Sequence, residues 1–403
     1  MQKRFRYNVM LSQQRRYRNG LLVIACICVS TVILRALNDR APKLTYWRGI
    51  PLKSNDNEEK DDWDNAEDLI PDTEDTKCDI QLMSFPVFHN KSFVKFGRRF
   101  ACDLIPYLEK FELLSTDFYE NSLGFQDNEV VFVTYASGNH FAESKMGIHT
   151  LRTNNFTNKI IFYDLGLSLL NIEELQGVCN LEIRVFNYTA YPKFVRNLYG
   201  YHFKPIIIAD IFREFKAFWI IDASARFKNL TNWKRFNHRV RSGAVEPFAL
   251  RHPSSHSIFA ATHNEMYNYL PLSASIARNY SMFDANTMFV VRSDFAKEAV
   301  KWNLLCALTK ECMDPPRSKL GCNFTNDRFG VSAGCHRYDQ SCINVIVASL
   351  KHRLGLPYQG HNLEKIRDSL DRTVRTLFKP CCQKVVISEL SKFVIRLSVF
   401  IAI

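Results

Sequence analysis

The stretch with the clearest potential for chemistry is Ala217–Phe227, which reads A-F-W-I-I-D-A-S-A-R-F. Its first five residues are apolar and aromatic, as in a fully buried strand, and Asp222 and Ser224 follow where that strand would leave the core. Ligands bind at the carboxyl ends of strands in open α/β sheets, where a carboxylate can hold a cation against a diphosphate or orient a sugar hydroxyl. Asp222 could instead do no more than cap the turn after the strand.

Short apolar runs alternate with longer amphipathic ones on both sides of this stretch. We expect further strands at 130–135, 160–164, 181–186 and 288–291, and helices at 205–215, 294–308 and from 339 onward. Strands that alternate with helices form a largely parallel sheet with right-handed crossovers. The predicted class is therefore α/β, with an open, mostly parallel sheet and helices on both faces.

Polar residues fall at the ends of three of these elements. The loop Ala136–His140 would join Asp222 at one edge of the sheet; it is small and polar, as a nucleotide-binding loop should be, but contains neither a Rossmann fingerprint nor a P-loop motif. Asp339 opens the last helix, where it could be an N-cap or a catalytic carboxylate. Ser293 is the expected N-cap of the helix at 294–308.

The length, composition and charge of the chain limit which class of protein it can be. The chain has 403 residues, of which 46% are hydrophobic, and its formal net charge is +12. This is enough apolar material for one large core with appendages, and it excludes a disordered protein. A basic body suits phosphate-bearing small ligands or anionic glycans. Nucleic acid is not an expected partner, because the N-terminal segment indicates export from the cytosol.

A membrane anchor is expected at 20–37. Gly20–Leu34 is uncharged and mostly apolar, close to the roughly 20 residues that a membrane span needs. Basic residues precede it, which keeps the N-terminus cytoplasmic: Lys3, Arg4, Arg6, Arg15, Arg16 and Arg18. A cleaved signal peptide fits less well, because the basic leader is long and no A-x-A-like site follows. The expected plan is a cytoplasmic tail (1–19), the anchor (20–37), an acidic stem (38–77), a lumenal domain (78–362) and an extension of unknown role (363–403).

The positions of the glycosylation sequons and cysteines are those expected if the domain at 78–362 lies in the lumen. Six N-x-S/T sequons follow the anchor and none precedes it: Asn90, Asn155, Asn187, Asn229, Asn279 and Asn323. Ten of the 12 cysteines also lie beyond the anchor, and no C-x-x-C pair is present. Disulfides in an oxidising compartment are therefore favoured over structural zinc, while the sequence leaves their pairing open.

Six pieces of the sequence occur in a familiar order: Val130–Tyr135 with its polar loop, Ile160–Leu165, Lys204 with its helix, W-I-I-D-A-S, F-D-A-N-T-M-F-V-V and Y-D-Q-S-C-I-N. Together they resemble nucleotide-sugar-dependent glycosyltransferases of the GT-A fold, and come nearest to the glycogenin-like and bacterial galactosyltransferase families. The likeness covers about 130–350, and its strongest element is the D-Q-x-x-x-N pattern one helix after F-D-A-N. The chain is also similar to a nematode-expanded family of uncharacterised type II membrane proteins.

The resemblance implies a role for each matching position. The uridine-side loop would comprise Thr134, Tyr135, Ala136 and Ser137. Asp222 would be the first carboxylate of the D-x-D motif, Asp284 and Asn286 would form the sugar-facing strand end, and Asp339 and Gln340 would form the wall beside the anomeric carbon. Either Asp284 or Asp339 would act as the acid–base or hydroxyl-orienting group.

Two departures from the family pattern bear on the cofactor and the sugar. Ser224 replaces the second D-x-D carboxylate, and a neutral hydroxyl binds a hard cation less tightly, so Asp222 is a weak candidate metal ligand. We expect Mn²⁺ dependence to be weak or absent, with basic groups such as Arg226 neutralising the leaving diphosphate. The family's F-N-A-G is F-D-A-N here. His361 could match the family's late metal-binding histidine or be an ordinary surface residue.

The expected function is that of a Golgi type II glycosyltransferase, which moves a sugar from a nucleotide diphosphate donor to a glycan or glycoprotein acceptor. The alternative is a catalytically silent descendant of the fold that binds glycans or serves as a structural Golgi component, and Ser224 is its main support. A secreted, cysteine-rich binding protein with a cleaved leader is a third possibility.

Overall fold

The computed structural model describes residues 78–89, 92–114, 124–227, 230–356 and 386–387. The expected tail, anchor and stem (1–77) lie outside the described residues, as does all of the C-terminal extension except 386–387. Within the described ranges, no helix has both the length and the apolar character that crossing a membrane requires.

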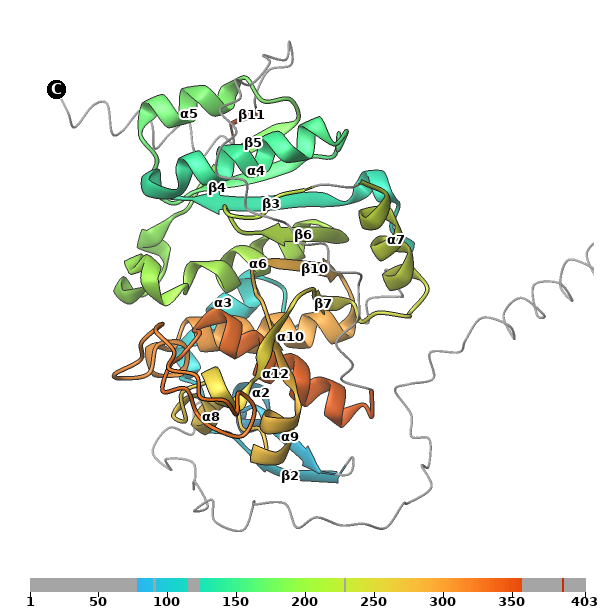
Figure 1. Cartoon of the computed structure of the whole chain (residues 1–403). Coiled ribbons are helices and arrows are strands. Elements are labelled where there is room, and N and C mark those ends of the chain that lie inside the picture. The colour runs from blue at the N-terminus through green and yellow to red at the C-terminus, as the bar shows by residue number, and fades with distance from the viewer. Residues whose placement is uncertain (1–77, 90–91, 115–123, 228–229, 357–385, 388–403) are drawn as a thin grey trace, which may run out of the picture. The chain divides into compact units, whose positions relative to one another are not determined.

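A seven-stranded sheet forms the centre of the domain, in the order β11-β5-β4-β3-β6-β10-β7 (Figure 1). The strands are β3 (Val131–Ala136), β4 (Ile160–Asp164), β5 (Leu181–Val185), β6 (Ala217–Ile221), β7 (Phe248–Leu250), β10 (Thr287–Val291) and β11 (Val386–Ile387). β11, β5, β4, β3 and β6 pair in parallel, whereas β10 runs antiparallel to both β6 and β7. The expected mostly parallel sheet is thus confirmed, with an antiparallel portion beyond β6.

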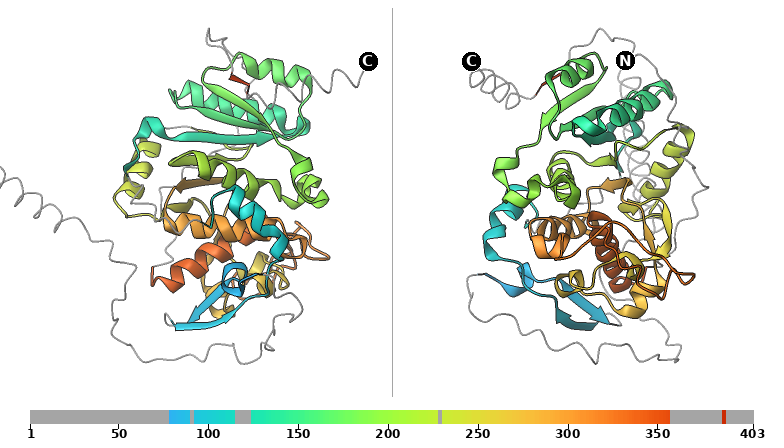
Figure 2. Two further views of the ribbon diagram at one scale, coloured as in Figure 1. Left: turned by 180° about the vertical axis from the view of Figure 1, so that it is seen from behind. Right: turned by 60° about the vertical axis from the view of Figure 1, so that its left-hand side comes forward.

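Helices cover both faces of this sheet, because its central strands are apolar on both sides. Phe218 and Ile220 of β6 share one core with α6 (Phe203–Glu214), α10 (Asp294–Ala307) and α12 (Asp339–Arg353). Trp219 and Ile221 of the same strand share the other core with α4 (Phe141–Thr153), α5 (Leu169–Gln176) and α7 (Leu230–Arg241). The two helix layers can be followed in Figures 1 and 2.

Smaller elements complete the fold. Two antiparallel pairs join β1 (Pro86–His89) to β2 (Ser92–Phe96) and β8 (Pro253–Ser257) to β9 (Ser281–Phe283). The short helices are α2 (Ile80–Met83), α3 (Ile105–Lys110), α8 (Met266–Tyr269), α9 (Ala274–Asn279) and α11 (Lys310–Met313). Single 3-10 turns occupy Cys102–Leu104, Asp127–Glu129, Gly138–His140, Tyr188–Ala190, Lys193–Arg196, Leu198–Gly200 and Phe259–Ala261. Ser293 caps α10 as expected, since its hydroxyl accepts from the Ala296 N–H at 3.2 Å.

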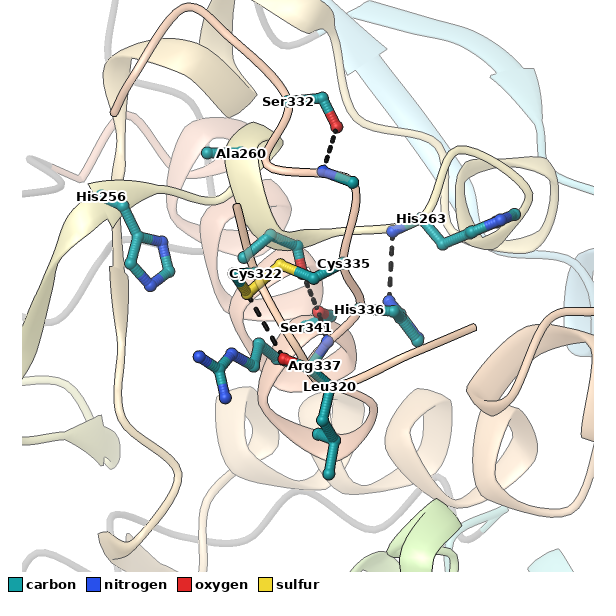
Figure 3. The surroundings of a disulfide bond; sticks show 12 residues. His256, Ala260, His263, Leu320, Cys322, Ser332, Cys335, His336, Arg337 and Ser341 are labelled. Carbon is teal, nitrogen blue, oxygen red and sulfur yellow. Dashed lines mark hydrogen bonds between the residues drawn. A yellow bond between two sulfur atoms is a disulfide. The ribbon is translucent and has the colours of Figure 1, made fainter. Parts of the chain in front are cut away.

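All cysteines of the described ranges except Cys342 form disulfides, as expected. The pairs are Cys78–Cys102, Cys306–Cys312 and Cys322–Cys335, and Cys179 is disulfide-bonded as well. Cys342 is a free thiol buried in α12. Cys322–Cys335 ties together the long loop that leads into α12, and Figure 3 shows this bond beside Arg337 and Ser341.

Candidate functional site

The sheet register brings three chain segments to one edge. Thr134 of β3 lies opposite Ile221 in the parallel pair, so Tyr135 and Ala136 end beside the residue that follows β6. β10 is antiparallel to β6, with Thr287 opposite Ile221, so the residues that precede β10 reach the same place. The Asp222 N–H donates to the Asn286 carbonyl at 2.8 Å, which joins the two segments directly.

Four side chains meet there in what we term the Lys204 cluster: Tyr135, Lys204, Asp222 and Asp339. The Lys204 Nζ lies 3.1 Å from Asp222 Oδ1 and 2.6 Å from Asp339 Oδ2. It also donates to the Ala285 carbonyl at 3.3 Å. The Tyr135 hydroxyl donates to Asp222. Asp222 is therefore held by both a cation and a phenol, and its side chain does not cap the following turn.

Burial and charge govern ionisation in this cluster. Lys204 is only 2% exposed and Asp339 only 6%. Burial lowers the pKa of Lys204, but Asp222 and Asp339 more than offset that effect, and the net pKa is well above the usual value. Burial and the Asp222 charge hold the pKa of Tyr135 well above its ordinary range. The ammonium and the phenol thus both keep their protons at neutral pH and serve as donors to Asp222.

A second group, the Asp284 cluster, comprises Ser254, Asp284 and Gln340. The Ser254 hydroxyl donates to Asp284 Oδ1 at 2.5 Å. The Gln340 amide donates to Ser254 Oγ at 3.0 Å and approaches Asp284 Oδ1 at 3.5 Å. Because Asp339 and Gln340 are consecutive in the first turn of α12, this turn contributes to both clusters.

The chain is tightly held where it enters α12. Tyr338 has φ 46°, a left-handed value that costs a non-glycine residue energy, and it is Tyr338 that occupies the N-cap position. Of the two interpretations of Asp339, the N-cap one is therefore wrong: Asp339 is the first helical residue, and its carboxylate pairs with Lys204. The Arg337 N–H donates to Ser341 Oγ at 3.1 Å, and that hydroxyl donates to the Ala261 carbonyl at 2.9 Å.

His336 supports the same loop from inside. Its Nδ1 accepts from the His263 N–H at 3.1 Å (Figure 3). Its Nε2 donates to the Met313 carbonyl, also at 3.1 Å. Burial lowers its pKa to about 3, with the nearby His263 adding to the effect. His336 is therefore neutral, and the hydrogen bond from His263 depends on that state because a proton on Nδ1 would remove the acceptor.

Asn344 connects α12 to the segment before Asp284. Its Oδ1 accepts from the Phe283 N–H at 2.7 Å, and its Nδ2 donates to the Phe283 and Gln340 carbonyls, both at 2.8 Å. Asn344 itself is fully buried. This amide explains the spacing of D-Q-x-x-x-N: the first two residues face the two clusters, and the asparagine one turn later fixes the backbone that carries Asp284.

The remaining expected residues lie around these clusters. Thr134 and Ala136 are buried in β3, and the Ser137 hydroxyl donates to Asn139 Oδ1 at 2.6 Å. Asn286 contributes its backbone carbonyl, while its side-chain oxygen is buried and has no hydrogen-bond partner in the described ranges. Ser224 is half-buried in the turn after β6.

Arg226 is directed at its own loop. Its Nη1 donates to the carbonyls of Ala223 at 2.8 Å and Ala225 at 2.9 Å. This loop packs against Gly147 of α4, where an added Cβ would come within 3.0 Å of the Ala225 carbonyl. Burial lowers the pKa of Arg226. In this structure, Arg226 therefore stabilises the loop that follows Asp222 through hydrogen bonds to its backbone.

The donors at this edge do not fit a divalent cation. Two partners already hold Asp222 Oδ1, Asp339 is paired with Lys204, and Ser224 offers only a neutral oxygen. In the part of the chain that the structure describes, no group of three or more His, Cys, Asp and Glu side chains could hold a metal ion. His361 lies outside the described residues.

Sequence reasoning did not assign roles to Lys204, Ser254 or Asn344. A signal for Lys204 was present: it is the one charged residue among the nine buried residues of α6. Lysine is almost never fully buried without a partner, so a lysine at the start of an apolar helix predicts a buried carboxylate. Ser254 lies in the polar run H-P-S-S-H-S, which carries no comparable signal.

Comparison with known proteins gives the following similarities. A family model described as "Protein of unknown function (DUF1647)" matches residues 81–209, a range that includes Tyr135 and Lys204 and ends before Asp222. No curated protein matches the chain.

Among solved structures, the bifunctional glycosyltransferase WbbM is similar at 14% identity and TM-score 0.36, covering 55% of this chain and 38% of that one. The galactosyltransferase LgtC, solved with donor and acceptor sugar analogues, is similar at 11% identity and TM-score 0.32. The match covers 54% of this chain and 70% of that one. An active-site mutant of LgtC matches at 13% identity and TM-score 0.31, covering 46% of this chain and 66% of that one.

Proposed function

We propose that this chain is a glycosyltransferase that moves a sugar from a nucleotide diphosphate donor to a glycan or glycoprotein acceptor. The observation that carries the proposal is the convergence of Asp222, Asp284, Asp339 and Gln340 at the carboxyl edge of a mostly parallel sheet. Ligands bind at this edge in open α/β sheets. The motifs around these residues resemble those of GT-A enzymes, which supports a nucleotide sugar as the ligand.

The Asp284 cluster suits work on a hydroxyl group. Sugar transfer breaks the bond from the anomeric carbon to the diphosphate oxygen and forms one to an acceptor oxygen, whose proton must go to a base. Ser254 and Gln340 both contact Oδ1 of Asp284, which fixes the carboxylate and leaves Oδ2 as the oxygen to accept a proton or orient a sugar hydroxyl. Asp339, held by Lys204, is instead suited to a fixed electrostatic role.

We place the protein in the Golgi membrane, as a single-pass type II protein with its domain in the lumen. The mostly apolar segment at 20–37 and the basic residues before it support this topology. Disulfides suit an oxidising compartment. Four sequon asparagines fall in the described ranges and all are exposed, as glycosylation requires: Asn155, Asn187, Asn279 and Asn323.

A catalytically silent descendant of the fold is the second candidate. Its support is that Lys204 already pairs with both Asp222 and Asp339, and that Ser224 replaces a carboxylate. Such a protein would bind a glycan or nucleotide sugar without consuming it. Donor turnover separates the two functions.

The test is release of nucleoside diphosphate from a panel of nucleotide sugars by the purified full-length chain, with and without glycan acceptors. We expect turnover with at least one donor, and loss of at least about 100-fold in Asp284→Asn if this carboxylate is the base. Asp210→Asn is the matched control, because Asp210 also accepts from a side-chain hydroxyl, that of Tyr163, at 2.5 Å but belongs to neither cluster. Turnover that is equal in both variants would contradict the role of Asp284, and binding without turnover would favour the silent descendant.

A further inference from the structure

One ammonium holds two carboxylates that come from distant parts of the chain. Asp222 follows β6 and Asp339 begins α12, and their carboxylate oxygens lie 3.1 and 2.6 Å from the Lys204 Nζ. A divalent cation bound by oxygen ligands at about 2.0–2.6 Å would join the same two carboxylates. The ammonium thus stands where an ion that joined these two carboxylates would bind.

The ammonium has no donor left for a ligand. Its remaining contact is with the Ala285 carbonyl at 3.3 Å, and the rings of Tyr135 and Tyr201 lie 5.8 and 5.5 Å from it. Lys204 is 2% exposed, whereas the Asp222 side chain is 26% exposed. Lys204 would therefore act on a ligand through the carboxylates it holds, as a positioning residue.

We propose that the Lys204 ammonium replaces a divalent cation at this edge of the sheet, so that the site takes up a nucleotide diphosphate without metal. The uptake of a nucleotide rests on the proposed function, whereas the exclusion of metal rests on the ion pairs alone. Lys204 cancels one of the two carboxylate charges, which lessens repulsion of a diphosphate. It also occupies the coordination space that a metal would need.

A second buried lysine in the same chain pairs with a carboxylate outside both clusters. Lys351 is 3% exposed and pairs with Glu246 at 3.0 Å. Removing Lys351 would take an ion-pair partner from one carboxylate, that of Glu246. Removing Lys204 would take it from two neighbouring carboxylates, those of Asp222 and Asp339. Two converging carboxylates attract a divalent cation far more strongly than one. Loss of Lys204 should thus create a metal site, and loss of Lys351 should not.

The experiment measures Mn²⁺ binding to the purified full-length chain by the loss of the free-ion signal in electron paramagnetic resonance. We expect no saturable binding to the unmodified protein below about 1 mM, a Kd at least about 10-fold lower for Lys204→Met, and no change for Lys351→Met. The double variant Lys204→Met/Asp339→Asn lacks the ammonium but keeps one carboxylate, and should also bind no Mn²⁺.

Two results would overturn the proposal. One is a folded Lys204→Met variant, judged by circular dichroism, that gains no Mn²⁺ affinity. The other is Mn²⁺ binding to the unmodified chain at about 50 µM or below that Asp222→Asn abolishes. If Lys204→Met does not fold, this second measurement still decides, because it uses the unmodified protein and the milder Asp222 variant.

A second arm uses UDP as the probe. UDP affinity of the unmodified chain should change by less than about threefold between EDTA and 1 mM Mn²⁺, and a gain above about 100-fold with Mn²⁺ would overturn the proposal. Absence of UDP binding in both buffers would count against the proposed function only. The Mn²⁺ measurements on Lys204→Met would still decide the role of the lysine.

Discussion

Lys204 is the residue on which the charge balance of the site depends. It is the only cation within 4.0 Å of either Asp222 or Asp339 in the described ranges. Breaking a buried ion pair by removing one partner is more costly than never having had the pair, because the other charge stays buried without compensation. Single-residue changes here should therefore have large and unequal effects.

Lys204→Met should lower the free energy of unfolding by about 3–5 kcal/mol, because two carboxylates lose their counter-ion. Urea unfolding followed by circular dichroism measures this. Adding Asp339→Asn to Lys204→Met should recover a part of the loss, since one of the two uncompensated charges is then gone. A loss below about 1 kcal/mol for the single variant would show that the cluster is open to water and only weakly coupled.

Ser254→Ala should reduce turnover or nucleotide-sugar affinity by about 10-fold, which corresponds to about 1.4 kcal/mol, while changing stability by less than about 1 kcal/mol. The hydroxyl donates to Asp284 and accepts from Gln340, so its loss frees the carboxylate to rotate. Ser242→Ala is the control, because the Ser242 hydroxyl donates to the Arg239 carbonyl at an exposed helix end and belongs to neither cluster. Equal effects of the two variants would remove Ser254 from the site.

At the scale of elements, α12 is the part that assembles the site. Its first turn carries Asp339 and Gln340, and Asn344 one turn later holds the backbone of Phe283. The loop before it is fixed by Cys322–Cys335 and by the neutral His336. Changes to these supports should act on stability and on the site together.

Asn344→Leu should cost about 2 kcal/mol of unfolding free energy, because it leaves the buried N–H and C=O of Phe283 without their amide partner. Asn303→Leu in α10 is a matched control: Asn303 is also buried, but its side-chain oxygen has no hydrogen-bond partner in the described ranges. We expect less than half the loss for this control. A larger loss for Asn303→Leu than for Asn344→Leu would mean that the hydrogen bonds from Asn344 to β9 contribute little to stability.

Acidification should destabilise the protein partly through His336. Its folded pKa of about 3 is below the unfolded value of about 6.5, so between these values the unfolded state binds more protons. Stability is therefore lost as pH falls from 6.5 toward 3, at up to about 1.4 kcal/mol per pH unit. The His336→Gln variant should have a lower free energy of unfolding at pH 6.5. Its unfolding free energy should also fall less steeply with pH, by about that amount per pH unit, as measured by urea unfolding from pH 6.5 to 4.5. Identical slopes would rule out this linkage.

Five strands of the central sheet and the helices α6, α10 and α12 could be predicted from sequence. Four of those strands, β3, β4, β6 and β10, are buried on both faces and so form continuous apolar runs. β6 is an example, since all five of its residues are buried. Two features could not be derived that way. The N-cap interpretation of Asp339 failed because an ion pair to Lys204, 135 positions away in the chain, directs its side chain. Ser254 could not be found because the β8–β9 pairing that places it depends on tertiary contacts in a polar segment.

At the scale of the whole molecule, the formal charge of +12 and the sequons are the relevant features. The proposed topology predicts that endoglycosidase treatment of the protein from cells lowers its apparent mass. Substituting the four exposed sequon asparagines, Asn155, Asn187, Asn279 and Asn323, by glutamine should remove most of that shift. An unglycosylated protein found in the cytosol would contradict the proposed topology.

We propose that the carboxyl edge of the sheet, around Asp222, binds a nucleotide diphosphate. Calorimetric titration of UDP and GDP into the full-length chain tests it most directly, with Asp222→Asn beside the control Asp210→Asn. We predict saturable binding of one of the two nucleotides, unchanged by Asp210→Asn and altered by at least about 10-fold by Asp222→Asn. Absence of binding by both nucleotides, or an affinity that Asp222→Asn leaves unchanged, would contradict the claim.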